Sequence, residues 1–482
     1  MKKPLLKNGK LDNSVLLERI KEINPYSNAL YSRLDDISVA RLFSDVFKEI
    51  ARFNTTAKEW YYYDGIVWKV DTGSMHVENY AKALSRALLI YSADIDSSDY
   101  KRYIARLGDR KKRVVMITDA RDFNFVETSD FDTNSDYFNC KNCVIDLTTL
   151  EVLEHNPDFL LSKVSNVYYD KNATSKDFEK FFSEIMKNDI EKMHYLQKVF
   201  GYALTGANTH EECYMLYGKS TRNGKSTLLD TISYLFGDYS KNTQPETFAQ
   251  QKERSSRTAS GDIARLDGCR FLHMSEPPKR MKFDVALLKT MLGRDVITAR
   301  NLCEREFQFI PVFKLFINTN YLPLVTDDTL FSSGRVKVIT FERHFEEWEQ
   351  DIKLSDKLKK KENISGIFNW LLCGLRSYLD DNEELFPPES VRRATSEYRT
   401  KSDKIQNFIN DCFVPDVIEN TACKDAFEVY TRWCRDNNYG VENKSNFIDE
   451  LRSKGLVSDT GTVKGMTIHN VIKGYRINRM LL

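Results

Sequence analysis

A glycine-rich segment that ends in a lysine and two hydroxyl residues is the part of this sequence whose spacing points most directly to chemistry. It reads Gly218-Lys-Ser-Thr-Arg-Asn-Gly-Lys-Ser-Thr227. Short apolar, β-prone text precedes it at 213–217, and apolar residues at helical spacing follow it from Leu228 to Phe236. A glycine-rich turn between a buried strand and a helix directs backbone N–H groups and the positive end of the helix dipole at an anion. The segment therefore predicts a phosphate-binding loop.

The residues of this loop divide into those that carry functional groups and those that shape the backbone. Lys225 can reach the β- and γ-phosphates of a nucleotide, and the Ser226 hydroxyl can hold Mg²⁺. Five residues, Lys219 to Asn223, separate the two glycines where the usual pattern has four. The longer loop still suits phosphate if Asn223 and Gly224 supply the tight turn, because both tolerate the left-handed conformation. The alternative is a chance Gly-Lys-Ser in a turn. The expected nucleotide-binding residues are Gly218, Asn223, Gly224, Lys225, Ser226 and Thr227.

Two apolar strands expected downstream of the loop end in polar side chains that can act on a nucleotide. The text at 270–276 ends in Glu276, whose carboxylate can hold Mg²⁺ or polarise an attacking water. The text at 314–320 ends in Asn320, whose amide can hydrogen-bond both the γ-phosphate and that water. The alternatives are a surface glutamate after a core strand and an asparagine that only ends a strand.

Cationic residues supply the remaining candidates. Arg335 opens an apolar strand, and it could reach a neighbouring subunit's γ-phosphate as an arginine finger or form a structural salt bridge. The text at 289–310 predicts a helix, a glycine turn and a β-hairpin. This hairpin could place Arg300 and Arg305 in a channel, where cations bind a nucleic-acid backbone without base preference. An ion pair between Arg300 and Asp295 is the alternative. The expected DNA-binding set is Lys289, Arg300 and Arg305.

The composition of the whole chain limits the classes of protein that it can be. With 482 residues the chain is too long for one ordinary core, and two to four domains are expected. The net charge of +1 argues weakly against a simple DNA-coating protein, although local basic surfaces remain open. No run of about 18 apolar residues and no signal peptide is seen, so neither a membrane span nor secretion is expected. Nine scattered cysteines suit a reducing cytoplasm. Cys140 and Cys143 form a single C-x-x-C; Cys143 is expected to face the core, and zinc or redox chemistry is the alternative.

The text before the loop mixes helical and β-like patterns. Aromatic runs around Asp64-Gly65 predict a β-hairpin, and 76–107 predicts helix. The basic cluster Arg110–Arg113 is interpreted as a solvated loop, with a nucleic-acid contact as the alternative. The text at 137–147 predicts a strand and a turn.

The text after the loop domain predicts a small C-terminal module. Three helix-like segments after residue 401 precede β-like alternation at 462–478, an order typical of a winged helix. Lys444, Arg452 and Lys454 lie near the possible recognition helix. Further helical text is expected at 175–206 and 347–380.

The ordered set of motifs resembles the superfamily 3 helicases, and more narrowly the helicase half of phage, plasmid and poxvirus primase-helicases. The matching text is GKSTRNGKST, RFLHMSE, LLKTMLGRDVITARNL, KLFINTNYLP and SGRVKVITF, with WYYYDGIVWKV and YFNCKNCVIDLTTLEVLEHNP before it. The text Gly293-Arg-Asp295 departs from the Gly-Gly-Asp common in relatives. The resemblance implies a homo-hexamer of AAA+-like domains with ATP at each subunit interface. It also implies the roles: Lys225 and Ser226 hold MgATP, Glu276 activates water or binds Mg²⁺, Asn320 senses the γ-phosphate, and Arg335 acts in trans.

We therefore expect an α/β AAA+-like P-loop core with a mixed α+β N-terminal domain and a C-terminal winged-helix-like module. The expected parts are an N-terminal domain at 1–165, a helical linker at 166–200, the ATPase domain at 201–345, a helical extension at 346–400 and the DNA-binding module at 401–482. The expected function is an ATP-dependent, ring-forming DNA helicase for replication of a phage or mobile element, in the cytoplasm of a bacterial host.

The expected partners and the rival functions follow from the same text. The helicase would act on single-stranded and forked DNA. Primer synthesis is not expected of this chain, because the text before residue 190 shows no catalytic carboxylate triad and no zinc set. A separate primase or a replication initiator could be a partner. An origin-binding initiator whose ATP site only controls assembly is the first alternative. A P-loop kinase or GTPase is the second, although it has no use for the hairpin.

Overall fold

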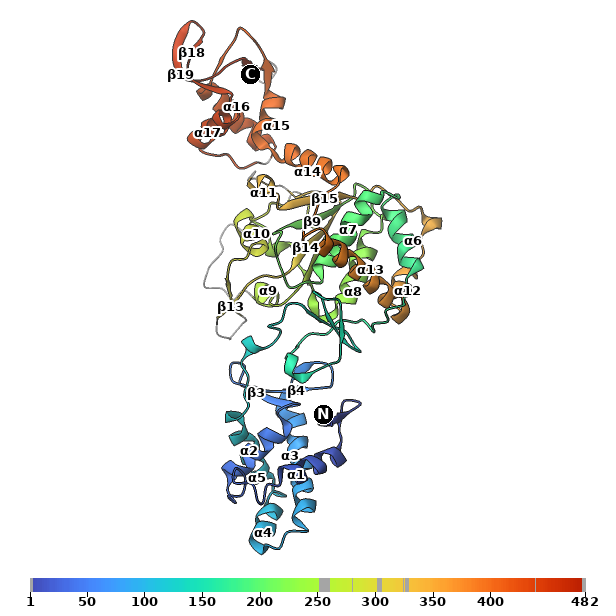
Figure 1. Cartoon of the computed structure of the whole chain (residues 1–482). Helices are drawn as coiled ribbons and strands as arrows, with labels where there is room; N and C mark the ends of the chain where they lie inside the picture. Colours follow the sequence, from blue (N-terminus) through green and yellow to red (C-terminus); the bar gives the residue numbers. More distant parts are fainter. Residues whose placement is uncertain are drawn as a thin grey trace.

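Three parts follow one another along the chain, and the central one is built on a parallel sheet (Figure 1). The structure is a computed structural model that describes residues 3–250, 261–279, 281–300, 306–323, 325, 329–437 and 439–478. The N-terminal and C-terminal parts lie at opposite ends of the central part (Figure 1). No helix within these ranges is both long and apolar enough to cross a membrane.

The central sheet has five parallel strands in the order β10-β11-β14-β9-β15. Met274, Ile317, Met215 and Val338 lie side by side in one row across four of the strands. Strands covered on both faces carry near-continuous apolar runs, and all six residues of β14 are buried. The strands are β9 (Cys213–Tyr217), β10 (Ser240–Thr243), β11 (Phe271–Ser275), β14 (Lys314–Thr319) and β15 (Val336–Thr340).

Helices cover both faces of this sheet because its side chains alternate between two apolar clusters. Tyr214, Phe271 and Phe316 belong to the cluster that contains α7, α8 and α13, whereas Leu272 and Ile317 belong to the cluster that contains α10. The central helices are α6 (Lys176–Ile185), α7 (Ile190–Ala203), α8 (Lys225–Phe236), α9 (Gly261–Ala264), α10 (Val285–Leu292), α11 (Thr329–Ser332), α12 (Leu354–Leu358), α13 (Lys361–Asp380) and α14 (Glu389–Ser402). The prediction of a helix at 347–380 is wrong at its start, because residues 347–349 form only a 3₁₀ turn and α12 begins at Leu354.

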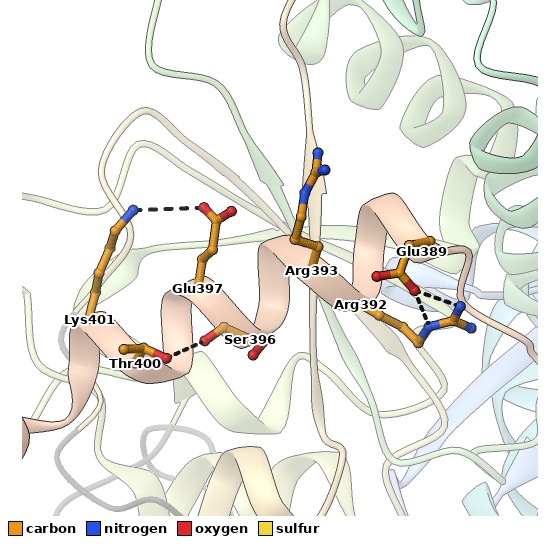
Figure 2. Close-up of a pocket in the computed structure, with 7 residues that line it drawn as sticks. All are labelled: Glu389, Arg392, Arg393, Ser396, Glu397, Thr400 and Lys401. Carbon is orange, nitrogen blue, oxygen red and sulfur yellow. Dashed lines mark hydrogen bonds and ion pairs between the residues drawn. The ribbon is translucent and has the colours of Figure 1, made fainter.

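Two local features fix the packing around the sheet. Helices α7 and α13 approach closely, since a Cβ on Gly374 would lie 2.1 Å from the Gln197 carbonyl oxygen. Helix α14 covers the edge strand β15, and the Thr395 hydroxyl accepts from the Val338 N–H at 3.0 Å. Figure 2 shows the outer face of α14, where Arg393 projects from the helix between two pairs of oppositely charged side chains.

The described residues of the N-terminal part combine helices with three small antiparallel sheets. The hairpin around Asp64-Gly65 is confirmed, with Tyr63 paired to Trp68. The loop interpretation of Arg110–Arg113 is wrong, because these residues form the first turn of α5. Cys143 is buried as expected, and Cys140 is buried as well. The elements are β1 (Leu6–Lys7), β2 (Lys10–Leu11), α1 (Asn13–Ile23), α2 (Asp36–Phe47), β3 (Ala51–Asn54), β4 (Glu59–Tyr63), β5 (Trp68–Val70), α3 (Met75–Ser92), α4 (Ser98–Arg106), α5 (Arg110–Asp119), β6 (Tyr137–Asn139), β7 (Val144–Asp146) and β8 (Val152–Leu153).

The C-terminal part contains the three predicted helices followed by a β-ribbon. The ribbon turns between Val463 and Met466, and it begins at Val457, before the predicted start. Two of the cations expected near a recognition helix are paired within the chain: Arg452 with Asp449 and Asp459, and Lys454 with Asp403. The elements are α15 (Lys404–Cys412), β16 (Phe413–Pro415), β17 (Thr421–Ala422), α16 (Cys423–Asp436), α17 (Lys444–Ser453), β18 (Val457–Val463), β19 (Met466–Ile472) and β20 (Tyr475–Ile477).

Candidate active site

The glycine-rich loop joins β9 to α8 as the sequence predicts. Gly224 takes a left-handed conformation with φ 82° immediately before the first residue of α8, Lys225. Gly218 serves close approach instead, because a Cβ there would lie 2.2 Å from the Asn223 amide nitrogen and 3.0 Å from Lys225 Nζ. The two glycines are therefore required for different reasons, and the loop opens at a helix N-terminus.

The loop accommodates its extra residue by a left-handed turn at Arg222, directly before Asn223. Arg222, with φ 56°, shares the left-handed conformation with Gly224, whereas Asn223 does not. The prediction that Asn223 supplies the left-handed turn is therefore wrong. Its buried side chain instead donates to the Ser220 carbonyl at 2.6 Å. The Phe345 N–H donates to the Arg222 carbonyl at 2.8 Å, which ties the bulge to the segment after β15.

Lys225 is a buried cation held by an amide. Its side chain is 3% exposed, and Nζ donates to Asn320 Oδ1 at 2.8 Å. Burial lowers the pKa of Lys225 to about 8, and the Glu276 carboxylate opposes this shift. Among the described residues no carboxylate forms an ion pair with Lys225, which suits an incoming phosphate. The structure thus brings together three residues that the sequence singled out separately.

Asn318 is a site residue that the sequence reasoning missed. Its amide donates to Ser226 Oγ at 2.9 Å, and its side chain is 4% exposed. Asn318 and Asn320 are two residues apart at the end of β14, so they face the same side of the sheet as Phe316, toward α8. The available signal was an amide directly after the apolar run Leu315-Phe-Ile317.

Glu276 follows β11 directly and is exposed. Its N–H donates to the Asn318 carbonyl at 2.8 Å, which continues the strand pairing by one residue. Simple alternation would place it with Leu272 and Met274 on the face away from α8. Its left-handed backbone, φ 52°, ends that alternation, and its carboxylate acts on Lys225. A left-handed glutamate costs about 1–2 kcal/mol, and such strain clusters at functional sites.

The donor set at this edge fits a magnesium ion. Mg²⁺ prefers oxygen ligands and uses one or two carboxylates together with substrate phosphates. The Ser226 hydroxyl and the Glu276 carboxylate are such oxygens, and they come from neighbouring elements at the carboxyl ends of the strands. Within the described residues no cluster of three or more His, Cys, Asp and Glu residues could hold a metal without a substrate.

A hollow of about 610 Å³ lies beside the loop. Its size is within the range of roughly 300–1,000 Å³ found for ligand sites. It is lined by α6 residues such as Phe181, by Arg222, Gly224 and Thr227, and by the segment after β15 that includes Phe345. Thr227 and Gly224 thus line the hollow, whereas Lys225, Ser226 and Asn320 are not among its lining residues.

Arg335 lies at the amino ends of the strands, opposite the ends that carry the loop. It precedes β15, and its guanidinium donates to the Lys289 carbonyl at 2.8 Å and pairs with Glu211. The same copy of the chain therefore does not bring Arg335 to its own loop. The sequence left a salt bridge and an arginine finger open, and the isolated chain has the salt bridge.

Two of the three residues expected to bind DNA, Lys289 and Arg300, lie within the described residues and in different places of the fold. Lys289 is on α10, where Nζ donates to the Thr329 hydroxyl. Arg300 follows β12 (Ile297–Ala299), which pairs with β13 (Phe307–Phe309) in the predicted hairpin. Arg305 lies outside the described residues.

Family comparisons agree with this arrangement of parts. Residues 40–187 match the family described as D5 N terminal like, and residues 400–457 match the family described as poxvirus D5 protein-like. The chain is thus similar to D5-type proteins in its N-terminal and C-terminal parts. Between these two regions, residues 216–335, which contain the loop and its partners, match a family of unknown function.

Viral proteins are similar to this chain over part of their length. The protein named “Putative helicase L207/L206” of Acanthamoeba polyphaga mimivirus is 29% identical over 348 residues, which are 67% of this chain and 35% of that protein. The protein named “Putative helicase 022R” of Frog virus 3 is 25% identical over 272 residues, which are 53% of this chain and 28% of that protein. The chain thus spans about a third of the length of these curated relatives.

A solved structure has a similar fold. The apo structure of the NrS-1 C-terminal region (305–718) covers 90% of this chain, and 99% of that structure is matched. The TM-score is 0.50 at 10% identity. This likeness concerns the fold alone.

Proposed function

We propose that this chain is an ATP-dependent DNA helicase of viral replication that works as a ring around single-stranded DNA. The observation that carries the proposal is the meeting of Lys225, Ser226, Glu276, Asn318 and Asn320 at the carboxyl ends of parallel strands. Polar groups gathered at this edge suit nucleotide hydrolysis. The strand order and the C-terminal helices with their ribbon support an AAA+-like core and a winged-helix-like module.

In this proposal each polar group has a distinct task in ATP hydrolysis. Lys225 exchanges its bond to Asn320 for the β- and γ-phosphates. The Asn320 amide, once released, hydrogen-bonds the γ-phosphate and the attacking water, so it reports which nucleotide is present. Glu276 orients and polarises that water. Ser226 and Glu276 would hold Mg²⁺, which neutralises phosphate charge when bound.

An exposed apolar pair beside the hollow supports assembly with a second copy. Trp348 is 83% exposed and Ile352 is 94% exposed, although the segment that carries them is anchored in the core by Phe345 and Leu354. Gln350 Nε2 donates to the Phe345 carbonyl at 3.0 Å, so this segment is held in place. Fixed apolar side chains in solvent mark contact surfaces. A neighbouring subunit seated here would border the nucleotide.

The affinity for MgATP is expected to fall as pH rises above 8. The pKa of Lys225 is lowered to about 8 in the free chain, so the ammonium that attracts phosphate is present below this pH and lost above it. Bound phosphate favours the charged form, so binding takes up a proton at pH 8–9. The dissociation constant should rise about tenfold between pH 7 and pH 9. Calorimetry in buffers of different ionisation enthalpy measures both effects, and a flat profile would contradict the role of Lys225.

Arg335 is proposed to act on the ATP of a neighbouring subunit. Arg335→Ala and Glu276→Gln should each remove most ATPase activity, because one lacks the donated cation and the other lacks the carboxylate. Mixing the two variants should restore part of it, since some interfaces then combine an intact Glu276 with an intact Arg335. ATPase rates over a series of mixing ratios give the measurement. Absence of recovery at every ratio would leave Arg335 with only its salt bridge to Glu211.

The experiment that tests the function as a whole is strand displacement on forked DNA, with the native mass of the particle measured with and without ATP. A ring helicase unwinds the fork, and its mass is a multiple of the chain's 56.2 kDa. Assembly without unwinding would favour an origin-binding initiator. ATPase activity that ignores DNA would favour a kinase or GTPase.

A further inference from the structure

We infer that helices α3 and α5 of the N-terminal part form a second nucleic-acid-binding surface, which holds the phosphodiester backbone of a single strand. The surface consists of Lys82 on α3 and Arg110, Lys111 and Arg113 on α5. In Figure 1 these helices lie well apart from the parallel sheet, so the inference goes beyond the proposed ATP site and does not depend on it.

Positive charge is concentrated in this segment of the chain. Residues 82–113 contain nine Lys and Arg residues against four Asp, a net charge of +5 in a chain whose total is +1. Lys82, Arg110 and Lys111 are exposed, and none of them forms an ion pair within the described ranges. A local basic patch in a nearly neutral chain attracts a polyanion to that patch.

The two helices border a hollow that suits a phosphate group. Helix α5 packs against α3, and the hollow of about 290 Å³ between them is lined by Lys82 on one side and by Arg110 and Arg113 on the other. Arg113 is fixed in place, because its guanidinium donates to the Leu107 carbonyl at 3.0 Å and to the Gly108 carbonyl. Glu78 is the one carboxylate among the described residues that line the hollow.

The position of the cations in α5 is unfavourable for the helix itself. The first turn of α5 contains no acidic residue and begins with four consecutive cations, at the positive end of the helix dipole. The capping residue, Asp109, makes no side-chain hydrogen bond to the helix. The charge of Lys112 is neutralised by Asp36 of α2 at 2.9 Å. Arg110 and Lys111 add positive charge at the N-terminus of α5, which is already the positive end of the helix dipole. A bound anion would relieve this repulsion.

A nucleic-acid strand fits this surface better than an acidic protein or a membrane. Lys82 and Arg86 are one helical turn apart on α3, about 6 Å along the axis, and they offer repeated charge to a repeated anion. Guanidinium groups bind phosphate oxygens with two N–H groups at once. The hollow is concave and narrow, whereas a lipid surface requires a convex or flat face.

The test compares two triple charge reversals in the full chain. The patch variant is Lys82→Glu, Arg110→Glu, Lys111→Glu. The control variant is Lys10→Glu, Lys48→Glu, Lys58→Glu, which changes three exposed lysines of the same N-terminal part by the same charge. Fluorescence anisotropy with a labelled oligothymidylate strand, without nucleotide and over a series of salt concentrations, measures the affinity and its salt dependence.

The patch variant should bind the strand at least about tenfold more weakly at low salt, while the control variant binds as the wild type does. Its slope of log affinity against log salt should be less steep by about 2, because three phosphate contacts each contribute about 0.7 for a single strand. Its melting temperature should stay equal or rise, because the substitutions place carboxylates at the positive end of α5. Loss of binding would then not reflect unfolding.

Other outcomes would overturn the inference. Equal binding by the patch and control variants would show that the surface does not touch DNA. So would a wild-type preference for polyglutamate or for phosphatidylserine vesicles at the same salt concentration. ATPase activity without DNA should be the same in both variants, whereas Lys225→Ala should remove it and leave this surface intact. Failure of the inference and failure of the proposed ATPase are therefore distinguishable.

Discussion

Replacement of Lys225 by alanine is expected to remove ATP hydrolysis and unwinding while the fold stays in place. The ammonium group is the one expected to meet the β- and γ-phosphates, and it is 3% exposed and held by Asn320 Oδ1 at 2.8 Å. Loss of one such preorganised cation should lower kcat/KM by on the order of 10²–10³-fold or more. Burial already disfavours the charged form, as its lowered pKa shows, so truncation should change the melting temperature by only about 3 °C.

The chain supplies its own matched control for this substitution. The tetrapeptide Gly-Lys-Ser-Thr occurs twice in the loop, at 218–221 and at 224–227. Lys219, in the first copy, is exposed and lies outside the helix, so Lys219→Ala should keep ATPase activity within a few-fold. ATPase rates, MgATP titration and thermal melting of both variants give the measurement. Full activity in the Lys225→Ala variant, or equal losses in the two variants, would sink the assignment of the nucleotide site.

Replacement of Glu276 by glutamine is expected to separate hydrolysis from binding. A carboxylate that polarises water contributes about 10²–10⁴-fold, so kcat should fall by this order. MgATP should still bind within a few-fold, because Lys225 and the loop remain. The Mg²⁺ concentration needed for half-maximal binding should rise, since one oxygen ligand has lost its charge. Single-turnover hydrolysis together with MgATP titration measures both effects.

The strained backbone of Glu276 gives a second variant with an opposite effect on stability. Glycine takes φ near 52° without strain, so Glu276→Gly should raise the melting temperature while it removes hydrolysis. The neighbouring exposed Ser275 is the control, and Ser275→Ala should change neither property. If Glu276→Gln kept the wild-type kcat, the carboxylate would have no part in the chemistry.

Arg335 and the exposed Trp348 place part of the proposed mechanism outside a single copy of the chain. Arg335 pairs with Glu211 and donates to the Lys289 carbonyl, at the end of the sheet away from the loop. Action in trans therefore requires that assembly replace this ion pair by a phosphate. Trp348, 83% exposed beside the hollow, lies where a neighbour could provide that driving force by covering it.

Features with a local physical cause could be predicted from the sequence. The strand–loop–helix unit follows from an apolar run, a glycine turn and helical spacing, and Gly237, with φ 56°, ends α8. The hairpin around Asp64-Gly65 and the pairing of β12 with β13 next to Arg300 could likewise be predicted, because each joins strands that are close in the sequence. Lys225, Ser226, Glu276 and Asn320 were found because each ends or begins an element, where side chains of a parallel sheet gather.

Features that depend on contacts distant in the sequence could not be predicted. The first turn of α5 looked like a loop, since four cations disfavour a helix start, yet packing against α2 and α3 forms it. Asn318 gains its meaning from Ser226, 92 residues away, and Arg222 takes the left-handed turn while Phe345 holds its carbonyl.

The sequence by itself determined which loop has the spacing of a phosphate-binding loop, which strands end in polar groups and in what order they occur, because local spacing and alternation set these properties. Only the tertiary structure decided that Arg222 rather than Asn223 takes the left-handed turn and that Asn318 supports Ser226. The tertiary structure also decided that Arg335 lies at the amino ends of the strands, away from the loop, and pairs with Glu211. The reason is that side-chain contacts across a parallel sheet join residues from separate strands, and no local pattern in the chain encodes those pairings.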